Sequence, residues 1–518
     1  MSPLKKARKP QGWRHQFDLA YSEGRFADAA AIFASAGATS RSDILLRAAR
    51  AYMHADPAAA LSLLLKLRVP TGASPQQIER DALLTEAFAR TRDFESADER
   101  LTVALRSATE LEDRDLLAFV GYRGVRRYLL AEDPAKAREY LKYTRAGKTP
   151  EAALYSSYSE AIILGYEERV REQAQRLLEL LRSLDPNSTA FMEVRAWSTH
   201  TLAGLARELY LPDAVSELDR QLSGYPWSKD FSPNRFQTLR SLAWAKALQG
   251  DYFNAFRHLK AASESASTDA WRAVAACDRA SLARYFDEHR WSRVELDEAE
   301  QLAGRVEWHA TRAEERMGLL SLAELFSTID TARSAMYLAR YRELGDMKSP
   351  LYYGHDARRE AYEKYSTGVI EIALGNAKRG LSQLRDARAV FERFGYDFRV
   401  ARCLIAEFRL TNDRNALPLI EEKLRNYPRS WLVKEFREIS GPLSVALPPM
   451  QKRVFEELCR GKTTAEISSL LGRSQYTVSN HIKAIFKTFG VKSRSALLAE
   501  AVRRGYIRHD GEGPSTQL

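Results

Sequence analysis

A short pattern of a turn residue, an aromatic residue and regularly spaced small or apolar residues recurs along most of this chain. It is clearest where Gly250 is followed by Tyr252, Ala255, Leu259 and Ala262. The same spacing returns at Gly24, Phe26, Ala29, Phe33 and Ala36, at Phe94, Ala97, Leu101 and Ala104, and at Gly375, Gly380, Leu384 and Ala387. Alanine at a helix crossing lets two antiparallel helices approach closely, so the pattern predicts repeated helical hairpins.

The spacing between copies of the pattern indicates a repeat of about 34 residues. Ala29 and Ala97 lie 68 residues apart, and a weaker copy at Pro57 and Ala60 falls between them. Looser copies follow near Ala137, Ala174, Ala214, Val294, Ala335 and Ala416. This arrangement resembles tetratricopeptide repeats. The resemblance implies an α-solenoid that acts as a sensor or as a docking region, with a concave groove for a protein or peptide partner.

The rest of the chain adds no signal for a sheet. Alternating apolar patterns bounded by turn dipeptides do not recur, whereas helical periodicity extends from Trp13 to Phe436. We therefore predict an all-α fold: a tetratricopeptide-like helical-hairpin solenoid followed by a four-helix module. The expected divisions are a disordered basic arm at 1–12, the solenoid at 13–440, a linker at 441–446, the module at 447–508 and a disordered tail at 509–518.

Residues that favour helix ends divide the module into four short helices. Pro449 and Gly461 bound the first helix. Thr463 and Glu466 form a capping box that opens the second helix, which ends at Gly472. Ser474 and Gly490 bound the third helix, and Ser493 opens the fourth. The second and third helices meet at a tight glycine turn. This is the helix-turn-helix arrangement, in which the later helix enters the major groove of DNA.

The third helix offers one face for reading DNA bases. Val478, Ile482 and Ile485 share an apolar stripe, so the outward side chains near the start of this helix are those of Gln475, Ser479, Asn480 and Lys483. Asparagine can pair with adenine and lysine can donate to guanine, which makes these four residues candidate base readers. The candidate phosphate contacts are Lys462, Thr463, Thr464, Tyr476, Thr477, Lys487 and Arg494.

Positive charge is concentrated in the module. Residues 447–508 contain twelve Lys or Arg and four Glu, so this segment carries +8 of the +11 net charge of the whole chain. A basic excess confined to a short segment is expected of a polyanion-binding surface, although charge alone fits a solvated basic surface as well.

The module resembles the LuxR/GerE-type helix-turn-helix family over about sixty residues. The residues that carry the resemblance are Gly461, Glu466, Ile467, Leu470, Leu471, Ser474, Thr477, Val478, His481, Ile485, Phe489, Val491 and Arg494. The resemblance implies a bacterial, sequence-specific transcription regulator that reads bases through Ser479, Asn480 and Lys483. One departure is Ser479 itself, which stands where the family usually has a basic residue.

Other functions are weighed against this interpretation. Region four of a sigma factor also opens with Leu-Pro, but His481 and the run from Phe489 to Arg494 favour the LuxR type. A repeat scaffold whose module binds DNA weakly or not at all is the main alternative for the whole chain. Nothing in the sequence indicates an enzyme, a cofactor or a metal site, because the cysteines are isolated and both Gly-Lys-Thr stretches lack the first glycine of a P-loop.

The fourth helix and the termini complete the expectations. We expect a homodimer on DNA, with a seam formed by Ala496, Leu497, Leu498 and Val502, although the same face could instead close the four-helix core. No signal peptide or membrane-spanning run is visible, so we expect a cytoplasmic protein with duplex DNA as its partner and no membrane partner.

Overall fold

In the computed structural model, every regular element of the described residues is a helix, as the sequence predicts. The described residues are 12–22, 26–36, 41–69, 73–185, 192–224, 232–266, 268–286, 289–311, 313–344, 356–440 and 447–503. The predicted linker 441–446, the predicted tail and nearly all of the predicted basic arm lie outside these ranges, as does Gly24.

The chain divides into two compact units. The first contains Met1–Leu410 and Glu422–Arg429, and the second contains Thr411–Glu421 and Ser430–Leu518. Residues 430–440, which the sequence analysis assigns to the solenoid, therefore group with the second unit.

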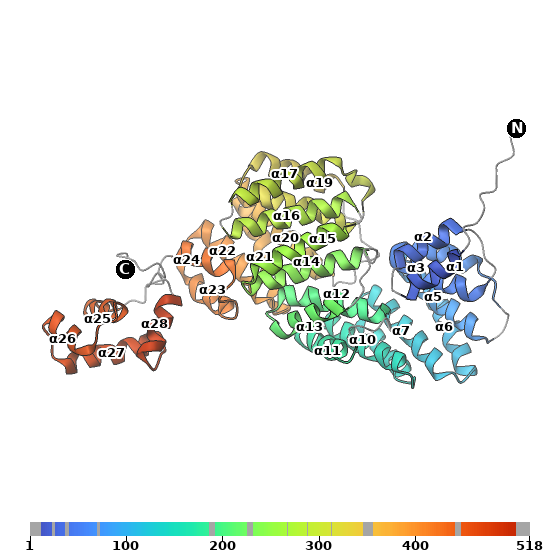
Figure 1. The fold of residues 1–518 in the computed structure, drawn as a ribbon, viewed down its shortest axis with the longest axis horizontal. Coiled ribbons are helices and arrows are strands. Elements are labelled where there is room, and N and C mark those ends of the chain that lie inside the picture. Colours follow the sequence, from blue (N-terminus) through green and yellow to red (C-terminus); the bar gives the residue numbers. More distant parts are fainter. Residues whose placement is uncertain are drawn as a thin grey trace. The chain divides into compact units, whose positions relative to one another are not determined.

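Helices of the first unit follow one another as antiparallel hairpins (Figure 1). α5 packs against α6 within its hairpin and against α7 of the next, and α16 packs in the same way against α17 and α18. The helices up to residue 429 are α1 (Trp13–Ser22), α2 (Phe26–Ala36), α3 (Ser42–Ala55), α4 (Pro57–Lys66), α5 (Pro75–Arg90), α6 (Phe94–Glu110), α7 (Arg114–Leu130), α8 (Pro134–Glu139), α9 (Leu141–Thr144), α10 (Pro150–Tyr166), α11 (Val170–Arg182), α12 (Met192–Glu208), α13 (Pro212–Gly224), α14 (Ser232–Leu248), α15 (Tyr252–Ser265), α16 (Asp269–Tyr285), α17 (His289–Arg305), η1 (Trp308–Ala310), α18 (Ala313–Phe326), α19 (Thr331–Glu343), α20 (Asp356–Ala373), α21 (Ala377–Arg393), α22 (Asp397–Thr411), η2 (Arg414–Ala416) and α23 (Leu417–Leu424). Stacked hairpins of this kind form a solenoid.

The predicted hairpin pattern marks the turn and the second helix of each hairpin. Gly250 has a φ of +78°, the side chain of Asp251 caps α15, and Ala255 and Ala262 are fully buried at the crossing with α14. The closest approach is between α20 and α21, where a Cβ on Gly380 would lie 2.6 Å from the carbonyl oxygen of Gly368. Small residues at these crossings thus set the distance between the paired helices.

Three of the looser copies are centred on residues that are not themselves fully buried, and Ala416 is one of them. Val294 is exposed on α17 and Ala335 is only half-buried on α19. Small buried residues on these two helices include serines. On α17, where Ala299 is also buried, Ser292 donates its hydroxyl to the carbonyl of Ala280, and on α19 Ser334 donates to that of Ala323. A search for alanine misses them, because a serine that bonds to the facing helix fits the same space.

Several hairpin turns place a residue other than glycine in the left-handed conformation. Arg92, Glu132 and Glu168 have φ values of +67°, +59° and +63°. In each turn, as in the turn at Gly250, the amide of the residue that follows donates a hydrogen bond to the carbonyl five residues before it. The amide of Asp133, for example, lies 2.9 Å from the carbonyl oxygen of Tyr128. These turns are Schellman motifs, and their hydrogen bonds hold the unfavourable φ in place.

The first unit also contains contacts between hairpins far apart in the sequence. Arg399 on α22 forms two hydrogen bonds with Glu208 on α12, at 2.7 and 3.1 Å. The Tyr252 hydroxyl, at the start of α15, donates to the carbonyl of Arg429 over 3.4 Å. The ring of Tyr210 packs edge-on against that of Tyr427, with 5.5 Å between ring centroids. The stack therefore closes on itself and does not run on as an open array.

Charged side chains are buried inside the first unit. Glu86 and Arg90 on α5 have no exposed surface, and Arg123 and Arg126 on α7 are almost as deeply buried. Carboxylates on helices are expected by default to lie on solvated faces. For Glu86 that expectation is wrong, because three guanidinium groups replace the water around its carboxylate.

The second unit holds η2, most of α23 and the five helices that follow. These five helices are α24 (Trp431–Ser440), α25 (Pro449–Cys459), α26 (Thr464–Leu471), α27 (Gln475–Phe489) and α28 (Arg494–Arg503). The last four start and end within a residue or two of the predicted positions.

Candidate nucleic-acid interface

One apolar core holds the four helices of the module together. Val454, Phe455 and Leu458 of α25 meet Ile467 of α26, and the cluster continues through Val478, Ile485 and Phe489 of α27 to Leu497 and Ala501 of α28. The rings of Phe455 and Phe489 stack with 4.9 Å between centroids. This packing fixes the side of α27 that faces inward, and therefore the side that faces outward.

α26 begins with the predicted capping box. The Thr463 hydroxyl accepts from the amide of Glu466 at 3.3 Å, and the Thr463 amide donates to the Glu466 carboxylate at 2.6 Å. The hydrogen bonds from the Thr463 amide and hydroxyl hold the pKa of Glu466 below its ordinary value. Both donors of Thr463 bond to Glu466, so Thr463 caps α26, and its predicted phosphate contact stays a prediction.

A tight turn joins α26 to α27. Gly472 has a φ of +59°, and the amide of Arg473 donates to the carbonyl of Ser468 at 3.1 Å. The next residue, Ser474, caps α27 by accepting from the amide of Thr477 at 3.1 Å. The turn leaves the N-terminal end of α27 at the surface, where Gln475 and Tyr476 are exposed.

The outward face of α27 is a stripe of polar residues spaced three or four positions apart. It consists of Tyr476, Asn480, Lys483 and Lys487, all of them exposed, with 77% exposure at Tyr476. Ser479 is half-buried and lies beside this stripe. The fold thus brings together two predicted base readers with two predicted phosphate contacts, and Ser479 and Gln475 are the neighbours of this outward stripe.

Cations on this side of the module differ in how they are paired. Lys483 and Lys487 form no ion pair with any described residue, and neither does the exposed Arg473 in the turn. Lys462, a predicted phosphate contact, instead pairs with Glu457 at 2.7 Å. Arg473 was not among the predicted contacts, although its position directly before the cap of α27 was readable in the sequence.

Two other predicted phosphate contacts have roles within the module. Arg494 donates to the carbonyl of Lys462 and, at 3.5 Å, to that of Leu458, so it ties the start of α28 to the end of α25. The hydroxyl of Thr477 lies 2.9 Å from that of Ser474 and belongs to the cap of α27. Thr464 is half-buried at the start of α26.

The predicted dimer seam on α28 needs one correction. Leu497 has no exposed surface and belongs to the core of the module, so it cannot also face a second copy. Ala496 and Leu498 are half-buried and keep some surface. The side chain of Val502 lies outside the described part of the chain.

Residues that could suggest enzymatic chemistry have structural surroundings. At Gly147-Lys148-Thr149 the amides of Lys148 and Thr149 both donate to the Asp115 carboxylate, at 2.9 and 3.1 Å. Burial raises the pKa of the Cys403 and Cys459 thiols to about 12, which disfavours the reactive thiolate. Among the described residues, no group of three or more His, Cys, Asp or Glu side chains is placed to hold a metal ion, and no helix is long and apolar enough to cross a membrane.

Comparison with known proteins identifies the module. The family described as "Bacterial regulatory proteins, luxR family" matches residues 446–501. The chain is 44% identical over 74 residues to the spore germination protein GerE of Bacillus subtilis (strain 168), a match that spans 93% of that protein and 14% of this chain. A chain in a solved structure of the APC/C hetero-tetramer Cut9-Hcn1 aligns with 84% of this chain and with 94% of its own length. The two chains are 13% identical, and the TM-score is 0.25.

Proposed function

The chain belongs to the LuxR family of bacterial regulatory proteins, whose helix-turn-helix module makes it a DNA-binding transcription regulator, and from this premise we propose that α27 reads the major groove of duplex DNA. Asn480 and Lys483 would contact base edges, with Ser479 and Gln475 beside them. Lys487 and Arg473 would contact the phosphates on either side of the groove.

The outward stripe on α27 is the observation that carries this proposal. Tyr476, Asn480, Lys483 and Lys487 project from one helix whose opposite face is buried in the core. The two lysines have no carboxylate partner among the described residues, so their charge is available to a polyanion. In a purely structural helix, we would expect exposed lysines at this spacing to alternate with acidic residues.

A salt titration of the full chain on duplex DNA tests DNA binding. If the module neutralises several phosphates, the logarithm of the binding constant falls linearly with the logarithm of the salt concentration, with a slope of roughly −0.9 for each phosphate contacted. Fluorescence anisotropy between about 50 and 200 mM salt measures this slope. Binding that is absent at low salt, or that does not change with salt, would contradict the proposal.

We also propose that the protein pairs on DNA through α28, because one module touches too few base pairs for high specificity. The surface left for this contact is Ala496 and Leu498. Leu498→Asp is expected to abolish the two-to-one complex on DNA, whereas Ala499→Asp, on the exposed side of the same helix, is expected to preserve it. Sedimentation on a DNA duplex with two half-sites distinguishes these outcomes, and equal behaviour of both variants would place the seam elsewhere.

For the solenoid we propose a docking role. Its successive first helices, such as α3, α5 and α7, lie against one another and form a continuous wall. A wall of this kind presents side chains from several repeats to one extended partner, such as a peptide or a protein segment. Capture of a partner by the full chain, but not by a variant with an altered wall, would test this role.

A further inference from the structure

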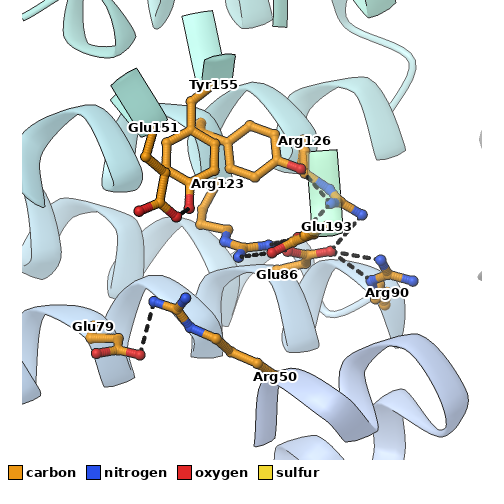
Figure 2. Close-up of polar contacts among 10 residues, drawn as sticks. Arg50, Glu79, Glu86, Arg90, Arg123, Arg126, Glu151, Tyr155 and Glu193 are labelled. Carbon is orange, nitrogen blue, oxygen red and sulfur yellow. Dashed lines mark hydrogen bonds and ion pairs between the residues drawn. The ribbon is translucent and has the colours of Figure 1, made fainter. Parts of the chain in front are cut away.

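The wall of first helices contains a cluster of charged and aromatic side chains near the N-terminal end of the solenoid (Figure 2). Arg50 comes from α3, Glu79, Glu86 and Arg90 come from α5, Arg123 and Arg126 come from α7, Tyr155 comes from α10, and Glu193 comes from α12. Five consecutive first helices therefore contribute to one site. No residue of this cluster belongs to the DNA-reading module.

The floor of the cluster holds more positive than negative charge. Glu86 accepts from Arg90 at 2.7 and 2.8 Å and pairs with Arg126 at 2.8 Å, and Arg123 reaches its other oxygen. Burial works against ionisation of Glu86, but the three guanidinium groups outweigh it and hold its pKa well below the ordinary value. One buried carboxylate thus faces three buried cations, which leaves two positive charges to be balanced from elsewhere.

Glu193 supplies a second carboxylate, from a different helix. Its two oxygens accept from the two terminal nitrogens of Arg123 at 2.9 and 3.1 Å, and one of them accepts from Arg126 at 3.2 Å. This is the two-pronged geometry in which an arginine fork matches a planar carboxylate. Unlike Glu86, the Glu193 side chain keeps 15% of its surface exposed.

Aromatic rings and one further arginine surround this position. Phe119 lies between Arg50 and Arg123, each with its guanidinium carbon 4.7 Å from the ring centroid. Tyr122 and Tyr155 stack at 4.7 Å. Arg50 is 24% exposed and pairs with the equally exposed Glu79 at 2.9 Å. Figure 2 shows the Arg50 side chain extending from α3 toward Glu79.

We propose that Glu193 occupies a carboxylate-binding site that an acidic side chain of a peptide partner takes over. This inference rests on the docking role proposed for the solenoid and specifies the chemistry of the partner. The occupant is itself a glutamate side chain held in fork geometry, so a glutamate or aspartate from a peptide meets the same donors. The exchange replaces one carboxylate by another, so the charge balance around the buried arginines is unchanged.

The first test removes the internal occupant and keeps its shape. In the full chain, Glu193→Gln leaves the donors of Arg123 and Arg126 in place but withdraws the competing charge. We expect this variant to bind a capped tri-glutamate peptide at least about tenfold more tightly than the natural chain does, as measured by calorimetry. Glu193→Asp, which keeps the charge on a shorter arm, is expected to fall between the two.

The controls separate this site from general charge effects. Glu172→Gln removes a carboxylate that Arg169 also holds by two hydrogen bonds, from Nε and one terminal nitrogen at 2.7 and 2.5 Å, but on the exposed surface. We expect Glu172→Gln to leave peptide affinity unchanged. A capped tri-glutamine peptide is expected not to bind any of the chains, and succinate is expected to bind far more weakly than the tri-glutamate peptide.

Several outcomes would overturn the inference. Equal affinity of the natural chain, Glu193→Gln and Glu193→Asp for the tri-glutamate peptide would show that Glu193 does not compete for the site. Tight binding of succinate without binding of the peptide would assign the site to a small carboxylate in place of a peptide. Salt-dependent DNA binding by the same preparations reports on the module separately, so a failure here is distinguishable from a failure of DNA recognition.

Discussion

The solenoid and the DNA-binding module use their positive side chains in opposite ways. In the solenoid, Arg90, Arg123 and Arg126 are buried against carboxylates of other turns and helices. In the module, Lys483 and Lys487 project outward from α27 and pair with no described residue. Residues 447–508 hold +8 of the +11 net charge, so the rest of the chain is close to balanced despite its many arginines.

This difference shows that the position of a charge matters more than its count. A guanidinium that is neutralised inside a repeat stack contributes to the cohesion of that stack and offers little to an external polyanion. A lysine that faces water on a helix with a buried back is free to neutralise a phosphate. The predictions below test this contrast, from the largest expected effect to the smallest.

Glu86→Gln is expected to cause the largest loss. The substitution leaves Arg90, Arg123 and Arg126 buried around a neutral amide, and breaking a buried pair in this way costs about 3–5 kcal/mol of unfolding free energy. Chemical denaturation followed by circular dichroism measures it. Glu172→Gln, at an exposed pair, is the matched control and is expected to cost under about 1 kcal/mol. Similar losses for both variants would remove the distinction between buried and exposed pairs.

The pH dependence of the unfolding free energy tests the buried charges of the solenoid a second time, at Glu208. Burial opposes its ionisation, but Arg399 and Arg207 lower its pKa from 4.5 to about 2. A carboxyl group whose folded pKa is depressed stabilises the fold above its unfolded pKa, and that contribution is lost as pH falls. We therefore expect the first unit to lose stability on the order of 3 kcal/mol between about pH 4.5 and 2.

Glu208→Gln provides the check on this pH effect. Thermal melts of the variant are expected to show a flatter dependence on pH in the acid range than melts of the natural chain, with lower stability at neutral pH. A slope unchanged by the substitution would mean that other carboxylates dominate acid unfolding.

Base reading by the outward stripe predicts a smaller and more selective effect. Lys483→Ala and Asn480→Ala are each expected to cost about 1–3 kcal/mol on a site selected from random DNA and almost nothing on unrelated DNA. Lys487→Ala is expected to weaken binding to both by a similar amount, because a phosphate contact carries no sequence information. Anisotropy titrations of the three variants on the two duplexes decide between these roles, and uniform losses throughout would contradict the assigned face.

The smallest expected effect concerns the turn between α6 and α7. Glu112 has a φ of +53°, a conformation that costs a residue with a Cβ about 1–2 kcal/mol, so Glu112→Gly is expected to stabilise the first unit by up to about 1 kcal/mol. Glu110→Gly, two residues earlier and still within α6, is expected to destabilise it by a similar amount. Thermal denaturation measures both. A loss of stability in both variants would show that the turn carries no strain.

The module was predictable from sequence because its helix ends are marked locally. Thr463 with Glu466, Ser474, Gly472 and Gly490 each act on residues within one turn of the chain, and each occupies its predicted place. The inward face of α27 followed from spacing alone. Leu497 was assigned to a surface seam because the apolar face of α28 has two available neighbours, the core and a second chain, and periodicity does not distinguish them.

The solenoid was predictable only where glycine or alanine performs the structural role. Gly250 and Ala255 were recognised, whereas Ser334 at a crossing and Glu132 in a left-handed turn were not. The hydrogen bonds that make these residues acceptable come from the neighbouring helix or the preceding turn. The burial of Glu86 was hidden for a similar reason, because its partners Arg123 and Arg126 lie on another helix.

The contacts that close the first unit on itself change how it is expected to fold. An open array of repeats has low contact order and can lose its end units one at a time, because each unit touches only its neighbours. The pairing of Arg399 with Glu208 joins residues 191 positions apart, so the loop between them must be closed before this contact forms. Removing the last hairpins would therefore expose the middle of the stack as well as its end, and unfolding is expected to spread through the whole unit.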